Sequence, residues 1–162
     1  IREKLNDRSG VAALNIKIGA AYFKLGNFEK SLSAQMKALK MFEALKFDPG
    51  SAQALNNVAA VFEMQKQYDK AREYYWKAIT MNLKNRDTIQ AASVIINVGN
   101  IHYRQNNYDS AAWYWRDALR RIPKRASPHY ESIAYNNLSE TYTLQKKYDS
   151  AFIFINKAIE LR

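Results

Sequence analysis

Residues 108–111 read Tyr108-Asp109-Ser110-Ala111, and this pattern of an aromatic residue, an acid and a later small residue decides the fold. It returns at a constant step of 40 residues, as Phe28-Glu29-Lys30-Ser31, Tyr68-Asp69-Lys70-Ala71 and Tyr148-Asp149-Ser150-Ala151. A small residue comes nine positions before each aromatic residue, and an alanine comes ten positions after it. These residues are Gly19, Ala59, Gly99 and Ser139, then Ala38, Ala78, Ala118 and Ala158. A fixed period without gaps predicts an array of structural repeats.

Within each 40-residue repeat, apolar residues recur at steps of three and four, as in Ile95, Val98 and His102. This spacing predicts two amphipathic helices per repeat. A polar break such as Asn106-Asn107 is short enough for a tight turn only, so the two helices form an antiparallel hairpin. The small residues let the helices approach closely, with aromatic rings filling the gaps beside them. Longer breaks at 48–51, 85–88 and 123–128 separate the repeats and contain all three prolines, which we expect to stop helices.

This combination of small-x-x-aromatic in the first helix and aromatic-x-x-small in the second resembles the tetratricopeptide repeat. The common form of that repeat has about 34 residues, whereas the repeats here have 40. The resemblance implies an all-α, right-handed superhelix, or solenoid, of four helical hairpins preceded by the end of another repeat. We predict a single domain with repeats at 11–50, 51–90, 91–130 and 131–162, and with residues 1–10 as the tail and turn of a preceding repeat. Both ends are those expected of an excised piece, and the last repeat is expected to be incomplete or uncapped.

The composition disfavours catalysis and membrane insertion. The 162 residues carry a net charge of +10 and include no cysteine, which excludes disulfides and thiolate chemistry. No run of about 18 apolar residues is present, so we expect no membrane span. The two histidines, His102 and His129, show no metal-ligand spacing, and no serine or glycine falls in a catalytic or phosphate-binding motif. We therefore expect no enzyme activity, no cofactor and no metal.

A series of asparagines points instead to binding. Asn57, Asn97 and Asn137 lie 40 residues apart, with Lys17 at the equivalent position of the first repeat. An asparagine side chain can hydrogen-bond both polar groups of a peptide unit, and in tetratricopeptide-like superhelices the first helices line the concave surface. The resemblance thus implies a groove that binds an extended peptide or protein segment. The predicted groove residues are Lys17, Lys24, Asn57, Met64, Asn97, Asn100, Tyr103, Arg104 and Asn137. The alternative is that the asparagines bond to neighbouring helices and fix the superhelix.

Two further partner classes stay open. The last helix carries apolar residues such as Phe152 and Ile153 with no later helix to cover them, so the array could be architectural and form homo-oligomers through this C-terminal face. A basic cluster suggests, as a less favoured alternative, that the chain binds nucleic acid or an acidic partner. The cluster comprises Arg116, Arg120, Arg121, Lys124 and Arg125. By resemblance, a long-helix array of this kind is the sensor, regulatory or scaffold part of a larger bacterial signalling or transcription-control protein.

Overall fold

The computed structural model describes residues 2–123 and 126–161, with side chains from residue 8 onward. These residues form helices and turns and contain no strand, which confirms the all-α fold class. The chain divides into two compact units, unit 1 at Ile1–Arg86 and unit 2 at Asp87–Arg162. Each repeat of such an array contacts only its sequence neighbours, and the assignment of the repeats to one domain stays a prediction.

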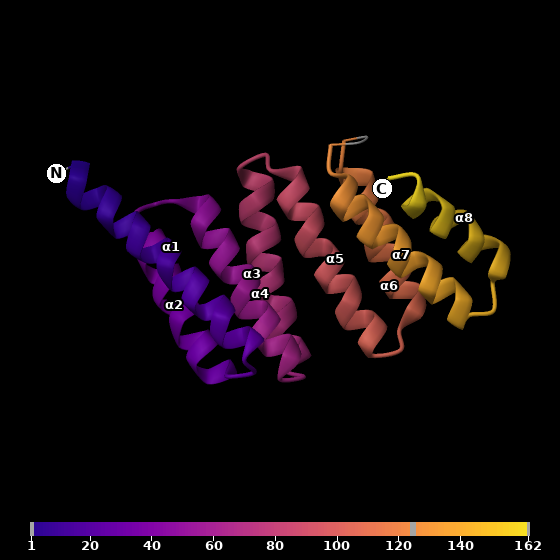
Figure 1. Cartoon of the computed structure of the whole chain (residues 1–162), viewed down its shortest axis with the longest axis horizontal. Helices are drawn as coiled ribbons and strands as arrows, with labels where there is room; N and C mark the ends of the chain where they lie inside the picture. The colour runs from indigo at the N-terminus through magenta and orange to yellow at the C-terminus, as the bar shows by residue number, and fades with distance from the viewer. Residues whose placement is uncertain (1, 124–125, 162) are drawn as a thin grey trace. The chain divides into compact units, whose positions relative to one another are not determined.

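Each unit holds two helical hairpins (Figure 1). Unit 1 comprises α1 (Arg2–Lys24), α2 (Phe28–Ala44), α3 (Asp48–Met64) and α4 (Tyr68–Lys84). Unit 2 comprises α5 (Thr88–Arg104), α6 (Tyr108–Arg121), α7 (Pro128–Leu144) and α8 (Tyr148–Ile159). Within each unit, the second helix of the first hairpin packs on the first helix of the next, and the two first helices also touch. Among the described residues, no helix combines the length and the apolar character that a membrane crossing requires.

One type of turn joins most of the helices. The three-residue turn after α3 places Lys66 at a φ of 60°, in the left-handed region. The Lys66 amide donates to the Glu63 carbonyl and the Gln67 amide donates to the Phe62 carbonyl, both at 2.9 Å, which satisfies two carbonyls at the helix end. Positive φ recurs at the middle residue of the other three-residue turns, namely Gly26, Lys46, Arg86, Asn106 and Lys146. The turn within a hairpin is therefore the same as the turns that join α2 to α3 and α4 to α5, whereas the connection from α6 to α7 is longer and begins with the extended residue Ile122.

Three predicted boundaries need correction. Pro49 and Pro128 lie in the first turns of α3 and α7, so they begin helices where stops were predicted. Proline suits this place because its missing amide hydrogen would have no partner in a first turn. The turn predicted near the end of 1–10 is absent, because α1 is continuous over Arg2–Lys24. That stretch has no proline, and a glycine such as Gly10 costs a helix only about 1 kcal/mol relative to alanine. The assignment of 1–10 to a preceding repeat stays a prediction.

The hairpin core depends on a close approach between the first helix and one side chain of the second. A Cβ atom added to Gly99 would lie 2.5 Å from the Trp115 indole nitrogen, and one added to Gly19 would lie 2.4 Å from the Gln35 amide nitrogen. Trp115 is 1% exposed and its Nε1 donates to the Ile96 carbonyl at 3.1 Å. Gln35 Nε2 donates to the Ile16 carbonyl, the equivalent acceptor of repeat 1, also at 3.1 Å. The small residues therefore make room for a buried side chain that bonds to the facing backbone.

The aromatic residues that reveal the period are less buried than expected. Tyr148 is 63% exposed, and Tyr108 is half-buried, with its ring 5.6 Å from that of Tyr103. These residues begin the second helices and pack across the turn, where solvent reaches one side of each ring. The largest buried side chains of the second helices come seven positions later, at Trp115 and Tyr75.

The close approach at Gly99 makes alanine unfavourable there. We expect Gly99→Ala to lower the free energy of unfolding by about 1–3 kcal/mol, because the new methyl group must displace the indole and its hydrogen bond. Gly10→Ala is the control, since a Cβ atom there meets nothing within 4 Å. It should be neutral or stabilising by up to about 1 kcal/mol in urea denaturation. Equal effects of the two substitutions would contradict the packing described here.

The turns allow a reciprocal exchange at equivalent positions. Gly26 and Lys66 have φ of 72° and 60°, so a side chain is strained at both. In about 0.5 M salt, where the charge of Lys66 interacts weakly with the helix end, Lys66→Gly should raise the free energy of unfolding by about 0.5–1 kcal/mol. Gly26→Lys should lower it by a similar amount. Chemical denaturation of both variants tests the turn geometry, and changes of the same sign would refute it.

Candidate functional site

The predicted binding residues all lie on first helices. In unit 1 they are Lys17 and Lys24 on α1, with Asn57 and Met64 on α3. In unit 2 they are Asn97, Asn100, Tyr103 and Arg104 on α5, with Asn137 on α7. Because α1 touches α3 and α5 touches α7, each unit brings its own members together. We call these sets the first-helix surfaces of unit 1 and unit 2.

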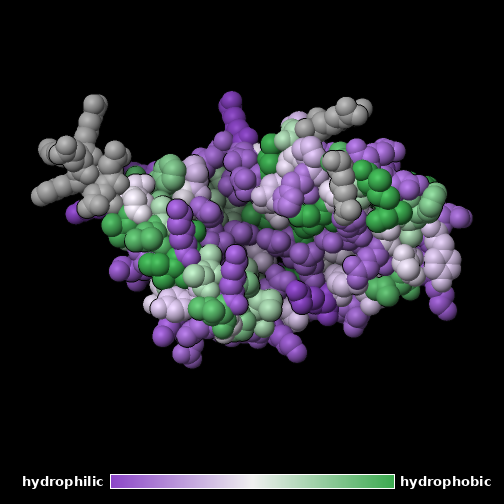
Figure 2. All heavy atoms as spheres, viewed as in Figure 1, coloured by the Kyte–Doolittle hydropathy of each residue, from purple (hydrophilic) through white to green (hydrophobic). Residues whose placement is uncertain are grey.

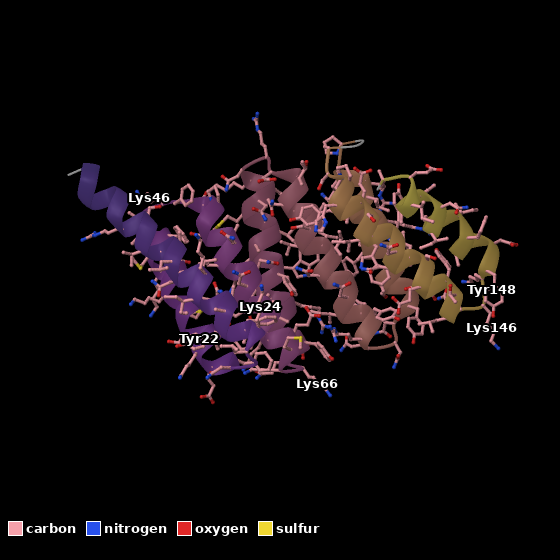
Figure 3. The ribbon with its side chains drawn as sticks, in the orientation of Figure 1. Tyr22, Lys24, Lys46, Lys66, Lys146 and Tyr148 are labelled. Atoms are coloured by element: carbon pink, nitrogen blue, oxygen red, sulfur yellow. The ribbon has the colours of Figure 1, made fainter. Side chains whose placement is uncertain are left out.

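The first-helix surface of unit 1 is open and positively charged. Lys17 and Lys24 are exposed, and Met64 is 45% exposed. Figure 3 shows Lys24 and Lys66 at the same end of the unit, where α1 and α3 finish, and Lys46 at the opposite end. Asn57 is half-buried, and its Nδ2 donates to the Gln35 side-chain carbonyl at 3.2 Å. Through Gln35, this asparagine is held against the core of the first hairpin.

The first-helix surface of unit 2 is polar and cross-linked. Asn137 Nδ2 donates to Asn100 Oδ1 at 3.1 Å, and the Tyr103 hydroxyl donates to Glu140 Oε1 at 2.6 Å. Both bonds join residues 37 positions apart, so they cross from α5 to α7 at successive helical turns. Asn97 is half-buried and Arg104 is exposed on the same helix. The Glu140 contact was absent from the predicted site, although the residue shares the repeat position of Asn100.

Tyr103 has an unusual titration. Burial against its neighbours, followed by the hydrogen bond to Glu140 and the charge of that carboxylate, raises the pKa of Tyr103 to about 12. Its ring also lies 5.9 Å from that of Trp115. The phenol therefore connects the buried indole to the polar surface, and it stays a hydrogen-bond donor at any physiological pH.

Asparagines of the series therefore form hydrogen bonds within the protein. Asn57 bonds to Gln35 and Asn137 bonds to Asn100, as the alternative interpretation of the sequence anticipates. The reason for their different partners is local. Ala20 occupies in repeat 1 the place that Asn100 occupies in repeat 3, and alanine offers no polar group. Each bond uses one amide hydrogen, and both asparagines remain half-exposed.

The described arginines of the basic cluster have partners within the chain. Arg121 Nε and Arg120 Nη2 contact Asp117 at 2.8 and 3.4 Å, so an acid of the same helix pairs with two of the predicted basic residues. Arg116 hydrogen-bonds to the Tyr142 hydroxyl and lies 5.8 Å from the Phe154 ring. Lys124 and Arg125 lie outside the described residues. The three described arginines are thus engaged in ion pairs or ring contacts within the chain.

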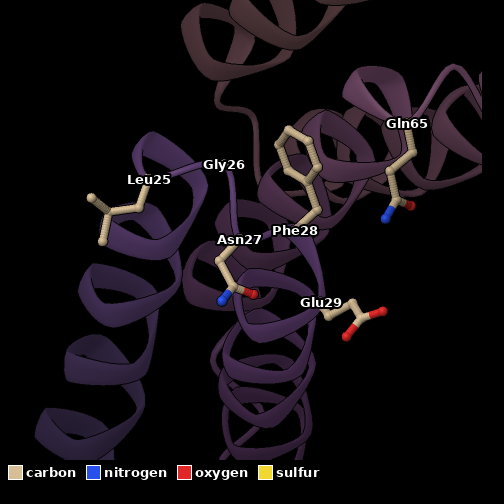
Figure 4. Close-up of a pocket in the computed structure, with 6 residues that line it drawn as sticks. All are labelled: Leu25, Gly26, Asn27, Phe28, Glu29 and Gln65. Atoms are coloured by element: carbon tan, nitrogen blue, oxygen red, sulfur yellow. The ribbon is translucent and has the colours of Figure 1, made fainter.

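Other candidate sites lack converging chemistry. A hollow of about 530 Å³ lies at the α1–α2 turn, but Figure 4 shows the Leu25, Asn27 and Phe28 side chains pointing in different directions. Asn27 Oδ1 accepts from the Lys30 amide and so caps α2. His102 stacks on Tyr114 with ring centroids 4.9 Å apart, in the packing role expected from its repeat position. Over the described side chains, no three histidine or acidic groups come together as a metal site requires.

Comparison with known families matches nearly the whole chain. The model of the tetratricopeptide repeat family matches residues 10–84 and again residues 88–162. The chain belongs to the tetratricopeptide repeat family. Among curated proteins, the general transcriptional corepressor trfA of Dictyostelium discoideum is 38% identical over 65 residues, which are 40% of this chain and 5% of that protein. The protein ycf37 of Pyropia yezoensis is 33% identical over 84 residues, covering 51% of this chain and 43% of that protein.

Solved structures share the fold of this repeat protein. The Rap conjugation regulator of plasmid pLS20, in complex with the Phr* peptide, superposes with a TM-score of 0.84 at 21% identity, over 94% of this chain and 42% of that one. A Rap protein complexed with competence and sporulation factor gives 0.84 at 17% identity, over 99% and 44%. PilF of Pseudomonas aeruginosa gives 0.76 at 27% identity, over 96% and 63%. The chain therefore spans less than two thirds of each of these relatives.

Titration of Tyr103 checks the cross-link between α5 and α7. The difference in tyrosinate absorbance between the wild-type chain and Tyr103→Phe should show one phenol ionising near pH 12. Because the pKa is higher in the folded chain than the ordinary value of about 10, the stabilisation is full below about pH 10 and is lost as pH rises through about 12. Glu140→Gln should move the ionisation back toward 10. An unchanged titration in Glu140→Gln would contradict the assigned bond.

Proposed function

We propose that this tetratricopeptide repeat chain is a non-catalytic interaction module that binds an extended peptide or protein segment on its first-helix surfaces. The observation that carries the proposal is the pair of side-chain bonds Asn100–Asn137 and Tyr103–Glu140, which hold polar groups in fixed positions at a half-exposed surface. Groups held in place before binding lose less conformational entropy when a ligand arrives. Fixed amides suit a ligand recognised through its backbone.

The spacing of the amides fits an extended chain. Neighbouring first helices lie about 10 Å apart, and an extended peptide rises about 3.3 Å per residue. Equivalent side chains on the two first helices of one unit would therefore meet about every third residue of the ligand. Asn57 and Asn137 each keep a second amide hydrogen and a carbonyl oxygen that can bond to a peptide unit.

The two surfaces favour different ligand side chains. In unit 1, Lys17 and Lys24 flank the small residues Ala20 and Ala60, which leave space for a side chain of the ligand. An acidic residue with a small apolar neighbour suits this unit, because the ammonium groups attract a carboxylate. In unit 2, the amides and the Tyr103 phenol suit uncharged backbone contacts.

Relatives support this function class. The two Rap structures were solved with a peptide and with competence and sporulation factor. Their identities of 21% and 17% establish a common fold, so peptide recognition by this chain is our inference. The corepressor trfA is a regulatory relative over 40% of the chain. We propose by the same reasoning that the module is the sensor, regulatory or scaffold part of a larger signalling or transcription-control protein.

Self-association is the second candidate. On α8, Phe152, Ile153 and Ile159 are 67%, 54% and 58% exposed. On α1, Figure 2 shows hydrophobic side chains gathered at the surface of unit 1, where Leu14 is 54% exposed. Either apolar surface could bind a second copy of the chain. Nucleic-acid binding is less favoured, because the described arginines of α6 pair with Asp117 or contact rings.

A random peptide library screened against the whole chain tests the proposal. We expect binders whose affinity falls about five- to tenfold in Lys24→Ala and Asn97→Ala, the size of one lost polar contact. Thermal melting should stay unchanged in Lys24→Ala, because that side chain is exposed. Lys37→Ala, an exposed lysine on α2, is the control and should leave affinity intact.

Light scattering on the same samples separates the two candidates. Concentration-dependent dimers with no peptide hits would exclude the peptide-binding proposal in favour of self-association. Equal loss of binding in Lys37→Ala would show that net charge, and not the first-helix surface, attracts the ligand.

A further inference from the structure

A second surface lies on the other side of unit 1, between the second helices. This outer groove, of about 700 Å³, is formed by the end of α2, the first half of α3 and the length of α4. Its apolar lining comes from Leu55, Trp76 and Met81. Its acidic lining comes from Glu43, Asp48 and Glu73. It shares no residue with the first-helix surfaces.

The repeat fold does not require the indole in this groove. Trp76 is 45% exposed, whereas Leu55 beside it is 5% exposed and belongs to the core. The residues equivalent to Trp76 in the other repeats are Met36, Arg116 and Asn156. Because arginine and asparagine stand at this position elsewhere, the repeat does not demand a large apolar ring there. The large apolar ring is therefore an added feature of repeat 2.

The charges of the outer groove are opposite to those of the chain. Lys77 pairs with Glu73 at 2.6 Å, and Lys84 reaches Asp48 across the groove at 3.8 Å. Glu43 is exposed and has no ion-pair partner among the described side chains. Three carboxylates against two ammonium groups leave the groove negative, in a chain whose net charge is +10.

The acidic cluster is also particular to this place. Positions equivalent to Glu43 hold Leu83 and Pro123 in the later repeats, and positions equivalent to Asp48 hold Thr88 and Pro128. An exposed indole and three acids therefore lie together in this groove, and the repeat pattern does not explain these residues.

We propose that the outer groove of unit 1 docks a basic segment of a partner protein through one apolar side chain and an adjacent arginine or lysine. The apolar side chain packs on Trp76, Leu55 and Met81, where an aromatic anchor removes the most surface from water. The cation pairs with Glu43, and an arginine can do so through two parallel hydrogen bonds. Carboxylates repel phosphate groups, so the same groove disfavours nucleic acid and anionic lipid.

The peptide library described above tests this surface independently of the proposed function. We expect a class of binders that carry an apolar residue next to arginine or lysine and that survive Lys24→Ala. In Trp76→Ala their affinity should fall by about tenfold or more, as for an interface anchor. In Glu43→Gln it should fall by about three- to fivefold, as for a rim charge.

Matched controls keep the test specific. Trp113→Ala removes an indole that is 55% exposed in unit 2, and Glu29→Gln removes an exposed acid of α2 outside the groove. Both should leave this class of binders unchanged. The absence of any Trp76-dependent class, or a Trp76-dependent class that is acidic, would overturn the proposal.

Competition with a small cation distinguishes the docking of a protein segment from the binding of a small organic cation. Tetramethylammonium alone should displace the peptides only at concentrations far above their dissociation constants, because it lacks the apolar anchor. Displacement at equal concentration would mean that the groove is a site for small organic cations and would overturn the docking of a protein segment.

Discussion

The contact that the rest of the fold depends on is the approach of a second-helix side chain to the backbone of the first helix. At Gly99 the indole of Trp115 occupies the volume of a missing methyl group and bonds to the Ile96 carbonyl. In repeat 1 a glutamine takes the same place beside Gly19. In repeat 2 the equivalent Tyr75 reaches the Glu63 carboxylate at 2.8 Å instead. The same backbone geometry thus accommodates a tryptophan, a glutamine or a tyrosine, because the small residue provides only the space for that side chain.

The same left-handed turn follows α1, α2, α3, α4, α5 and α7. In unit 1 the same turn follows α1, α2 and α3, so equivalent residues of its two repeats face the same way. The surface can then change without changing the frame. Asn100 and Tyr103 in unit 2 correspond to Ala20 and Phe23 in unit 1, so equivalent surfaces become cross-linked and polar in one unit and open in the other. The residues that differ between repeats therefore determine what each surface can bind.

The sequence predicts the repeat, the hairpins and the family, because these follow from spacing alone. It does not predict which partner a polar side chain chooses. Asn57 bonds to Gln35 because Ala20 has no polar group, and this requires knowing that the three positions meet. The sequence does contain the information for the pairing of Arg121 with Asp117, since the two residues lie four positions apart on one helix. The roles of Pro49 and Pro128 were reversed because proline is tolerated at a helix start as readily as it ends one.

The three tryptophans differ in their exposure to solvent, so their fluorescence can report on one unit of the chain. Trp115 is 1% exposed in the core of unit 2, whereas Trp76 and Trp113 are 45% and 55% exposed. The equivalent core positions of unit 1 are Gln35 and Tyr75, neither of which is an indole. A water-soluble quencher therefore suppresses the fluorescence of Trp76 and Trp113. The remaining fluorescence comes from Trp115, which lies in unit 2. The unfolding of unit 2 can therefore be followed by itself, without attaching any dye.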